Sequence, residues 1–261
     1  MSYSFETIRL EVGRRGVAKI VLNRPAKHNA LNSTMIDEFT RAVEALAKNQ
    51  SVRVVLLSAE GASFCAGADL TWMREQFNAD RNTRINQALR FSHLLQQLDN
   101  LPKLLIGVAQ GHAYGGGVGL LCTCDIVLAT PAVNFTLSEN RLGIIPATIA
   151  PFVISRVGLA NVRRYSLNGN PISAEEALAI GLVSELRDPQ VLDNAVEHQI
   201  KLALACAPGA VAAAKGLFRR IATGLSTPTD TVEALADRWE SAEAKQGIEA
   251  FFEKRKPPWA E

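Results

Sequence analysis

The sequence has no strong excess of charge of either sign, and this excludes one broad class of partner. Its 261 residues carry 28 basic and 26 acidic side chains, for a net charge of +2. The longest basic cluster is the three-residue run Lys254-Arg255-Lys256. A nucleic-acid surface built on many phosphate contacts needs a larger basic patch than this. Nucleic acid is therefore not an expected partner.

Cysteines and long apolar runs are also scarce. The four cysteines (Cys65, Cys122, Cys124 and Cys206) lack the paired spacing and neighbouring histidines of a zinc site, so we expect buried, reduced thiols and no metal. No basic stretch followed by an apolar run opens the chain, and no window approaches about 18 uninterrupted apolar residues. We expect a soluble, unprocessed, cytoplasmic protein without a membrane segment.

The first half of the chain alternates strand-like and helix-like patterns. Residues 7–12 and 17–23 alternate apolar and polar side chains across a Gly16 turn, which predicts a hairpin. Ser33 is suited to cap a helix whose apolar residues then recur at spacings of three and four. Apolar runs that predict buried strands lie at 52–58, 104–109, 125–129 and 133–135. Because helical patterns separate these runs, at 83–98 and after the glycines, we predict an α/β domain with parallel strands and a ligand crevice at their carboxyl ends.

Helical patterns dominate beyond residue 152. The run Ser173-Ala174-Glu175-Glu176 has the spacing of a capping box and predicts a short helix that Gly181 ends. Amphipathic helices are expected at 191–205 and 208–222. We therefore divide the chain into an α/β core, residues 1–190, and a helical region, residues 191–261, whose apolar faces favour contacts between subunits.

Residues 115–125 read GGGVGLLCTCD, a glycine stretch that fits neither phosphate-loop pattern. Glycines between a strand and a helix allow backbone N–H groups to approach a ligand closely, and close helix packing is the alternative explanation. A second small-residue loop, SFCAGADL at 63–70, follows the 52–58 strand just as the glycines follow the 104–109 strand. Each loop can supply one N–H to a single carbonyl oxygen, and such a pair of donors is an oxyanion hole.

Five motifs in order resemble the crotonase family, also called the enoyl-CoA hydratase/isomerase family. They are SFCAGADL, GHAYGGGVGLLCTCDIVLA, FTLSENRLGIIPA, ISAEEALAIGLVSEL and FFEKRKPPW, and the similarity runs from Phe5 to Trp259. The resemblance implies a spiral of β-β-α repeats and a C-terminal helical region that forms a homotrimer or, from two trimers, a homohexamer. It also implies a coenzyme A thioester as substrate and no separate cofactor.

The same resemblance implies roles for individual residues. The backbone N–H groups of Ala68 and Gly116 would polarise the thioester carbonyl, and Gly115 belongs to the same glycine loop. The residues expected to bind coenzyme A are Ala66, Asp69 and Leu70 beside the adenine and pantetheine arm, Lys27 of the LNRPAKHNAL stretch near the phosphates, and Phe251 and Lys254, which would reach a coenzyme A held by a neighbouring subunit.

One position departs from the family's hydratases, which carry two glutamates. Here the first glutamate position is Gly119 and the second is Glu139. A single acid is common in the isomerase branch. We expect the apolar acyl pocket to raise the pKa of Glu139, and the glycine to leave open space for a water opposite it. Tyr114 and Ser138 are candidates to replace the missing acid.

A finer resemblance points to hydration. The GGGVGL stretch, the SENRLGIIPA stretch and the Ala-Pro-Phe-Val continuation are similar to bacterial methylglutaconyl-CoA hydratases, whose substrates carry a second carboxylate that Arg141 or Arg74 could pair with. Trp72 and Met73 are candidates to wall the acyl pocket. The leading interpretation is therefore a hydratase of a 2-enoyl-CoA, with Glu139 as acid and base. The alternatives are an enoyl-CoA isomerase that uses Glu139 as its single base, and a non-catalytic hexamer that binds coenzyme A or RNA.

Overall fold

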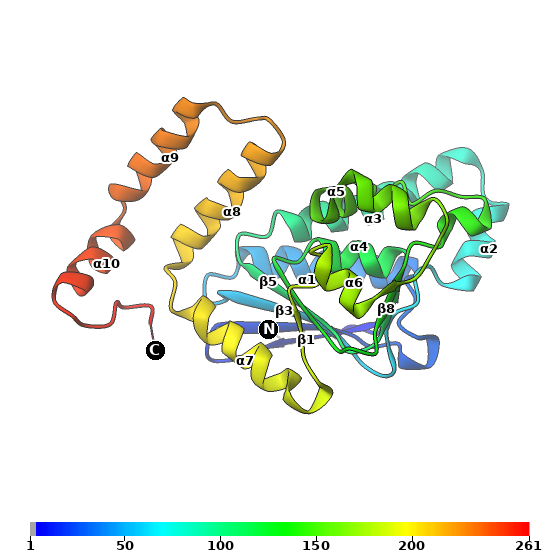
Figure 1. Ribbon diagram of the computed structural model, residues 1–261, viewed down its shortest axis with the longest axis horizontal. Coiled ribbons are helices and arrows are strands. Elements are labelled where there is room, and N and C mark those ends of the chain that lie inside the picture. Colours follow the sequence, from blue (N-terminus) through cyan, green and yellow to red (C-terminus); the bar gives the residue numbers. More distant parts are fainter. Residues whose placement is uncertain (1–3, 261) are drawn as a thin grey trace.

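The computed structural model describes residues 4–260, which form two β-sheets, the helices around them and a helical arm that extends to one side (Figure 1). The larger sheet has the strand order β1-β2-β3-β5-β7-β10. Its strands are β1 Ile8–Val12, β2 Val17–Leu22, β3 Val54–Ala59, β5 Leu104–Ala109, β7 Ile126–Ala129 and β10 Glu185–Leu186. β1 and β2 pair antiparallel, which confirms the predicted hairpin, and the remaining neighbours pair parallel.

A smaller sheet has the strand order β4-β6-β8-β9. Its strands are β4 Ser63–Cys65, β6 His112–Tyr114, β8 Asn134–Thr136 and β9 Ile172–Ser173. β4, β6 and β8 pair parallel, and β9 closes the sheet antiparallel to β8. Along the chain, β3, β5 and β7 of the larger sheet are each followed by one of these short strands and then by a helix. This alternation confirms the predicted α/β spiral of β-β-α repeats.

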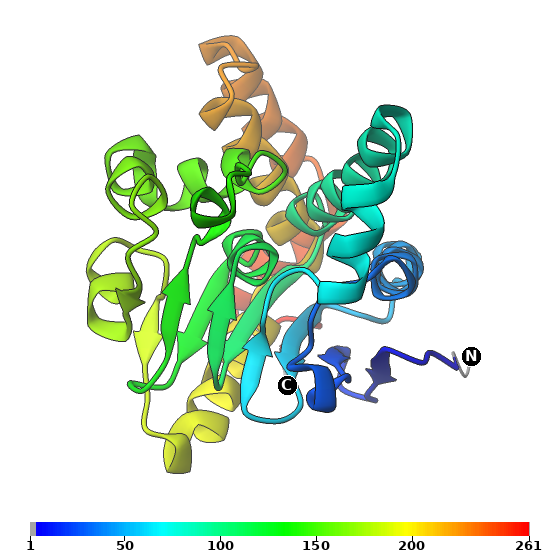
Figure 2. The same ribbon diagram turned by 90° about the vertical axis from the view of Figure 1, so that its right-hand side faces the viewer.

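The helices that connect the strands along the chain cover one face of the sheets (Figures 1 and 2). They are α1 Ser33–Lys48, α2 Leu70–Asn78, α3 Arg81–Asp99, α4 Gly116–Cys122, α5 Ala150–Ser166 and α6 Ala174–Ala179, with short 3-10 turns at Pro25–Lys27 and Glu139–Leu142. The helix that begins at Ser33 is capped by Asn32, whose side chain accepts a hydrogen bond from the Met35 N–H at 2.9 Å. The prediction that Ser33 is the cap is therefore wrong by one residue. The capping box of Ser173 and Glu176 is confirmed.

The helix α7, Pro189–Leu204, covers the opposite face of the larger sheet. Its buried residues, Leu192, Val196, Ile200 and Leu204, recur every four positions. They pack against apolar residues of β3, β5 and β7. The division of the chain at residue 190 stays a prediction, and α7 is the part of the second segment that lies on the sheet.

The helices α8 Pro208–Ala222, α9 Pro228–Trp239 and α10 Ala242–Phe252 form an arm that leads away from the two sheets (Figure 1). Two ion pairs join α8 to the core: Lys215 Nζ lies 2.7 Å from Asp125 Oδ2, and Arg219 Nε lies 3.2 Å from Asp99 Oδ2. Much of the apolar surface of the arm is uncovered in the single chain.

The sequence predicts that all four cysteines are buried. Cys65, Cys122 and Cys124 are buried free thiols, whereas Cys206 is exposed after the end of α7, so the prediction that it is buried is wrong.

Across residues 4–260 no single helix is long and apolar enough to cross a membrane; the pair α7 and α8 passes that test together but is bent by 98°.

Candidate active site

A cavity of about 540 Å³ lies where the loops after β4 and β6 meet. Its walls come from α2, α3, the glycine turn before α4 and the segment 138–149. Apolar side chains form much of the lining, among them Leu31, Trp72, Met73, Phe91, Leu142 and Ile145. The predicted acyl wall of Trp72 and Met73 is thus part of the lining. Both loops begin at the carboxyl ends of adjacent parallel strands, where α/β proteins commonly bind ligands.

The first loop presents the Ala68 amide because its neighbours are already bonded. The Leu31 N–H donates to the Gly67 carbonyl at 2.7 Å, and the Asp69 N–H donates to the Leu31 carbonyl at 2.8 Å. Leu31 and Ala68 therefore form a parallel bridge. In a parallel ladder the residue between two bonded groups directs its own N–H to the opposite side. The Ala68 N–H donates no hydrogen bond within residues 4–260.

The second loop presents the Gly116 amide in the first turn of α4. Gly115 precedes the helix with a positive φ of 46°, and its N–H donates to the Thr136 carbonyl at 2.9 Å. The Gly116 N–H is one of the first-turn amides that a helix leaves unbonded. A Cβ on Gly116 would lie 2.6 Å from Leu31 Cδ1, so any side chain here would displace the Leu31 side chain.

The two loops touch each other. A Cβ on Gly67 would lie 3.2 Å from the Tyr114 carbonyl oxygen, and one on Gly117 would lie 2.7 Å from the Cys65 Cβ. Ala68 and Gly116 both line the cavity. Two unbonded amides from distant parts of the sequence therefore meet at one cavity, as an oxyanion hole requires.

Glu139 begins the 3-10 turn after β8 and is the only carboxylate in the cavity lining, within the part of the chain that the structure describes. Its Oε1 lies 2.8 Å from where a Cβ on Gly115 would be, which places the carboxylate against the glycine turn. Its Oε2 is buried and has no hydrogen-bond partner among residues 4–260. Burial raises the pKa of Glu139 above its ordinary value of 4.5, and a bond from its own backbone N–H offsets this in part. A carboxylate with a raised pKa is suited to take up and return a proton near neutral pH.

The space beside Gly119 is filled, not open. A Cβ on Gly119 would lie 2.8 Å from the Cβ of Ile149, and Ile149 is buried in the cavity lining. Gly115 and Gly119 are four residues apart and so lie on one face of the glycine turn and α4. Glu139 packs against the first glycine and Ile149 against the second. The expectation that Gly119 leaves room for a water is therefore wrong, because an apolar side chain from the segment before α5 occupies that place.

The other polar candidates divide into those at the cavity and those away from it. Tyr114 and Ser138 line it, and so does Thr148, which the sequence analysis did not single out. Neither Arg74 nor Arg141 contributes to the lining, so neither holds the position expected of it. Arg84 is the one cation there within residues 4–260. Its guanidinium donates to the last carbonyls of α2, at 2.8 Å to Gln76 and 2.9 Å to Phe77.

The residues expected to bind coenzyme A are spread more widely. Ala66, Leu70 and Gly115 line the cavity. The Asp69 carboxylate caps α2 by accepting from the Thr71 N–H and pairs with Arg24 at 2.9 Å. Lys27 ends an exposed 3-10 turn outside the lining, and Phe251 and Lys254 lie at the end of the arm, also outside it.

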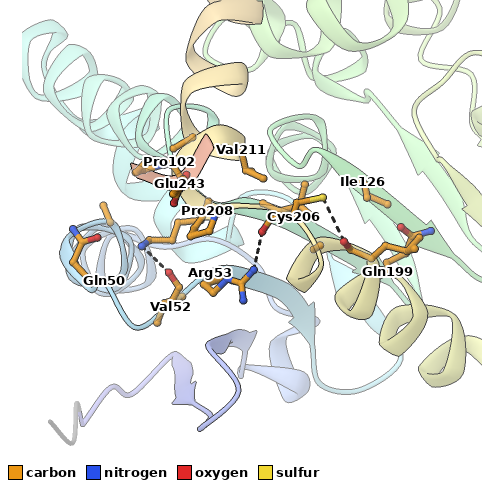
Figure 3. A pocket seen from close by; sticks show the side chains of 17 residues that line it. Gln50, Val52, Arg53, Pro102, Ile126, Gln199, Cys206, Pro208, Val211 and Glu243 are labelled. Carbon is orange, nitrogen blue, oxygen red and sulfur yellow. Dashed lines mark hydrogen bonds between the residues drawn. The ribbon is translucent and has the colours of Figure 1, made fainter. Parts of the chain in front are cut away.

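A second cavity, also of about 540 Å³, lies at the junction of α7 and α8, beside Leu104 of β5 and Ile126 of β7 (Figure 3). Next to it the Arg53 guanidinium donates to the carbonyls of Leu204, Cys206 and Trp259 at 2.7–2.8 Å, and so joins the residue before β3 to the start of the arm and to the C-terminal segment. Across the part of the chain that the structure describes, no group of three or more His, Cys, Asp or Glu side chains is placed to hold a metal ion.

Two unbonded backbone N–H groups and one half-buried carboxylate at a single cavity are an arrangement that can stabilise negative charge on a carbonyl oxygen and move a proton nearby. The chain belongs to the enoyl-CoA hydratase/isomerase family, whose model matches residues 13–261. It is thus an enzyme of this family.

Relatives of the chain cover nearly its whole length. The short-chain-enoyl-CoA hydratase of Clostridium acetobutylicum is 31% identical, with 92% of each chain covered. A crystal structure of an enoyl-CoA hydratase from Shewanella pealeana superposes with a TM-score of 0.94 at 36% identity, covering 98% of this chain and 96% of that one. The structure of Pseudomonas aeruginosa AtuE gives a TM-score of 0.94 at 35% identity and covers 98% and 100%.

Proposed function

We propose that the protein adds water across the double bond of a 2-enoyl-CoA thioester, with Glu139 as the sole acid and base. The observation that carries the proposal is the meeting of the unbonded Ala68 and Gly116 amides with the only carboxylate of the cavity lining, within residues 4–260. Relatives over 30% identical that are named enoyl-CoA hydratases support hydration as the reaction.

The proton balance needs one carboxylate. Glu139 takes a proton from water as the water oxygen bonds to C3, and the electron pair of the double bond moves through C2 to the thioester oxygen. The amides of Ala68 and Gly116 hold the resulting enolate. Glu139 then returns the proton to C2, and the double bond to oxygen re-forms as the carbonyl. Water is the only co-reactant, and no separate cofactor takes part.

For the acyl group we propose a branched substrate, with 3-methylglutaconyl-CoA as the first to test. The support is Arg84, since the second carboxylate of such a substrate needs a cation and Arg84 is the only one lining the cavity within residues 4–260. Arg84→Met should weaken the use of 3-methylglutaconyl-CoA and leave that of uncharged crotonyl-CoA nearly unchanged. An equal loss with both substrates would exclude Arg84 as the carboxylate partner.

We also propose that the chain assembles as a homotrimer or homohexamer through its arm. The support is a set of large apolar side chains, on α8, α9, α10 and the connection between α8 and α9, that are more than half exposed in the single chain: Phe218, Leu225, Val232, Leu235, Trp239, Phe251 and Phe252. Only a second copy would bring Phe251 and Lys254 to a bound coenzyme A beside Ala66, Asp69, Leu70 and the more distant Lys27. Light scattering that gave the mass of one chain would overturn this part of the proposal.

The second candidate is an enoyl-CoA isomerase that moves a double bond between the β,γ and α,β positions. The contact between Gly119 and Ile149 favours it, since an apolar side chain stands where hydration would gain from a second polar group. Isomerisation needs only that Glu139 take a proton from C2 and return it to C4, with the electron pair held as an enolate between the two steps.

Mass spectrometry of the products separates the two reactions. Incubation with crotonyl-CoA and with 3-methylglutaconyl-CoA should give products heavier by one water. A 3-enoyl-CoA converted to an isomer of unchanged mass, with no water gained on either 2-enoyl substrate, would replace hydratase by isomerase. Glu139→Gln should stop whichever reaction occurs, and activity that survived it would show that another group is the base.

A further inference from the structure

The loop that carries Ala68 is held from outside the cavity by a buried asparagine. Asn29 is fully buried and has a left-handed backbone with φ 53°, a conformation that asparagine adopts more readily than most residues. Its side-chain N–H₂ donates to the carbonyls of Glu60 at 2.8 Å and Ser63 at 2.9 Å, and its side-chain oxygen accepts from the Arg24 N–H at 2.8 Å. One side chain thus ties the segment 24–31 to both ends of the turn between β3 and β4.

The backbone continues this attachment up to Ala68. The Ala66 N–H donates to the His28 carbonyl at 2.9 Å, and Leu31 then bonds on both sides of Ala68, to Gly67 and Asp69. These bonds decide which way the Ala68 N–H points, because they use the flanking groups and leave that amide to face away from Leu31. The segment 29–31 therefore sets the direction of one donor of the oxyanion hole.

A buried ion pair strengthens the same attachment. Arg24 Nη2 lies 2.9 Å from Asp69 Oδ2, and Arg24 Nη1 donates to the Ala30 carbonyl at 2.6 Å. Both side chains are largely shielded from water. Burial alone would raise the pKa of Asp69, but bonds from the Thr71 N–H and from Arg24 outweigh it and leave the pKa below its ordinary value. Asp69 is thus charged at neutral pH. Its ion pair with Arg24 fixes the position of Asp69, which directly follows Ala68.

We infer that Asn29 is a positioning residue for catalysis: through the Leu31 bridge it holds the Ala68 N–H at the angle that a thioester oxygen requires. The inference rests on the proposed function, because it assumes that Ala68 donates to that oxygen. Asn29 does not line the cavity, and it acts only through the loop. Hydrogen-bond donors in an oxyanion hole are sensitive to small displacements, since loss of one donor costs about a hundredfold or more in rate.

Two variants remove the attachment in different ways. Asn29→Gly keeps the left-handed backbone at little cost and removes all three side-chain bonds. Asn29→Asp keeps the acceptor for the Arg24 N–H but replaces the donor to Glu60 and Ser63 by a second oxygen. If one variant fails to fold, the other decides the question.

Asn32→Ala is the matched control. Asn32 lies three residues further on and caps α1, so its loss should lower the thermal midpoint without changing the segment 29–31. For each protein, kcat, the dissociation constant of free coenzyme A and the thermal midpoint are measured. The direct readout is the infrared C=O stretch of crotonyl-CoA bound in a Glu139→Gln background, which shifts when the thioester oxygen accepts hydrogen bonds.

The expected result is a fall in kcat of about tenfold or more for both Asn29 variants, with little change in the affinity for coenzyme A. Their C=O stretch should move back toward its value in water, whereas Asn32→Ala should keep the kcat and the stretch of the parent protein. If the Asn29 variants keep the parent kcat and stretch and lose only stability, as Asn32→Ala does, the inference is overturned. If the parent protein itself shows no shift on binding, the proposed oxyanion hole fails and the inference fails with it.

Discussion

Ile149 occupies the space that any side chain on Gly119 would need, since its Cβ lies 2.8 Å from where a Cβ on Gly119 would be. The two residues come from different elements, the buried helix α4 and the cap of α5. Neither can change in size without the other, because protein interiors are packed too tightly to absorb an extra group.

The first prediction follows from this contact. Gly119→Ala should lower the free energy of unfolding by about 1–3 kcal/mol through overpacking. Gly216→Ala is the control: it lies inside α8, where the nearest atom to an added Cβ is the end of the Arg220 side chain at 3.9 Å, and it should raise stability by about 0.5–1 kcal/mol. Urea denaturation at neutral pH measures both.

The same pair allows a second acid to be installed. Gly119→Glu alone should unfold the site, whereas Gly119→Glu with Ile149→Gly should fold, because the smaller residue vacates the space. If the single Gly119→Glu variant is as stable as the parent protein, Ile149 does not fill this place in solution. The double variant also tests chemistry, since a higher rate of water addition would show that the apolar wall limits hydration.

The second prediction concerns the pH dependence of catalysis. Glu139 acts as a base only when ionised, and burial raises its pKa above 4.5. We therefore expect kcat/KM to fall as the pH is lowered, with a midpoint above that of an ordinary glutamate. Glu139→Gln should lose about a hundredfold or more in rate, and its kcat/KM should not fall further as the pH is lowered. A profile that stays flat down to pH 4.5 in the parent protein would contradict a raised pKa.

The third prediction contrasts the buried Glu38 with the half-buried Glu139, whose pKa values move in opposite directions. Burial would raise the pKa of Glu38, but bonds from the Glu6 and Thr7 amides and the Thr7 hydroxyl outweigh it and lower the pKa below 4.5. Because the pKa of Glu139 is higher in the folded protein than in the unfolded chain, this residue stabilises the fold fully below pH 4.5. That stabilisation is lost as the pH rises through the pKa of Glu139 in the folded protein. The lowered pKa of Glu38 means that its share is present above pH 4.5 and is lost as the pH falls.

Substitution by glutamine should therefore have opposite effects on stability. At pH 7, Glu139→Gln should raise the free energy of unfolding, and Glu38→Gln should lower it by about 1–3 kcal/mol through loss of charge-assisted bonds. Both differences should shrink toward pH 4. Urea denaturation at pH 7 and pH 4 measures the free energy of unfolding of each variant. If both substitutions change it in the same direction at pH 7, the direction of the pKa shift is wrong for one of the two glutamates.

The sequence predicts the long strands and the two loops better than the contacts between them. β3 and β5 are continuous apolar runs, and the small-residue loops that follow them can be recognised from the chain alone. The strands β4, β6 and β9 of the smaller sheet have only two or three residues, too few for a periodic pattern, so they could not be predicted from alternation, whereas β8 lies close to the predicted run at 133–135.

At the candidate site, too, motifs predicted individual residues better than the contacts between distant elements. Glu139, Ala68 and Gly116 were placed together by motifs, and the structure brings all three to one cavity. The space beside Gly119 and the cation of the cavity lining were predicted wrongly, because Ile149 and Arg84 reach the cavity through the paths of the 143–149 segment and of α3. Such paths depend on packing between distant elements, which hydrophobic periodicity does not encode.

The last prediction concerns the attachment of the arm. Arg53→Met keeps an apolar stem of similar length but leaves three carbonyls, of Leu204, Cys206 and Trp259, without their donor. Because the carbonyls of Leu204 and Trp259 are partly shielded from water, losing their donor is costly and the arm should open more often. Amide hydrogen exchange should therefore quicken in residues 205–222 and 242–260 and stay slow in the strands of the larger sheet.

Arg164→Met is the control for this experiment, since Arg164 lies on α5 and, among residues 4–260, makes only an exposed ion pair with Glu176 and a contact with the adjacent Tyr165 ring. It should leave exchange in the arm unchanged. Faster exchange spread evenly over the sheet and the arm in Arg53→Met would mean that Arg53 supports the whole fold. Exchange confined to the arm would show that the arm opens as a unit while the sheets and the cavity with Glu139 stay closed, because Arg53 joins the two parts without touching that cavity.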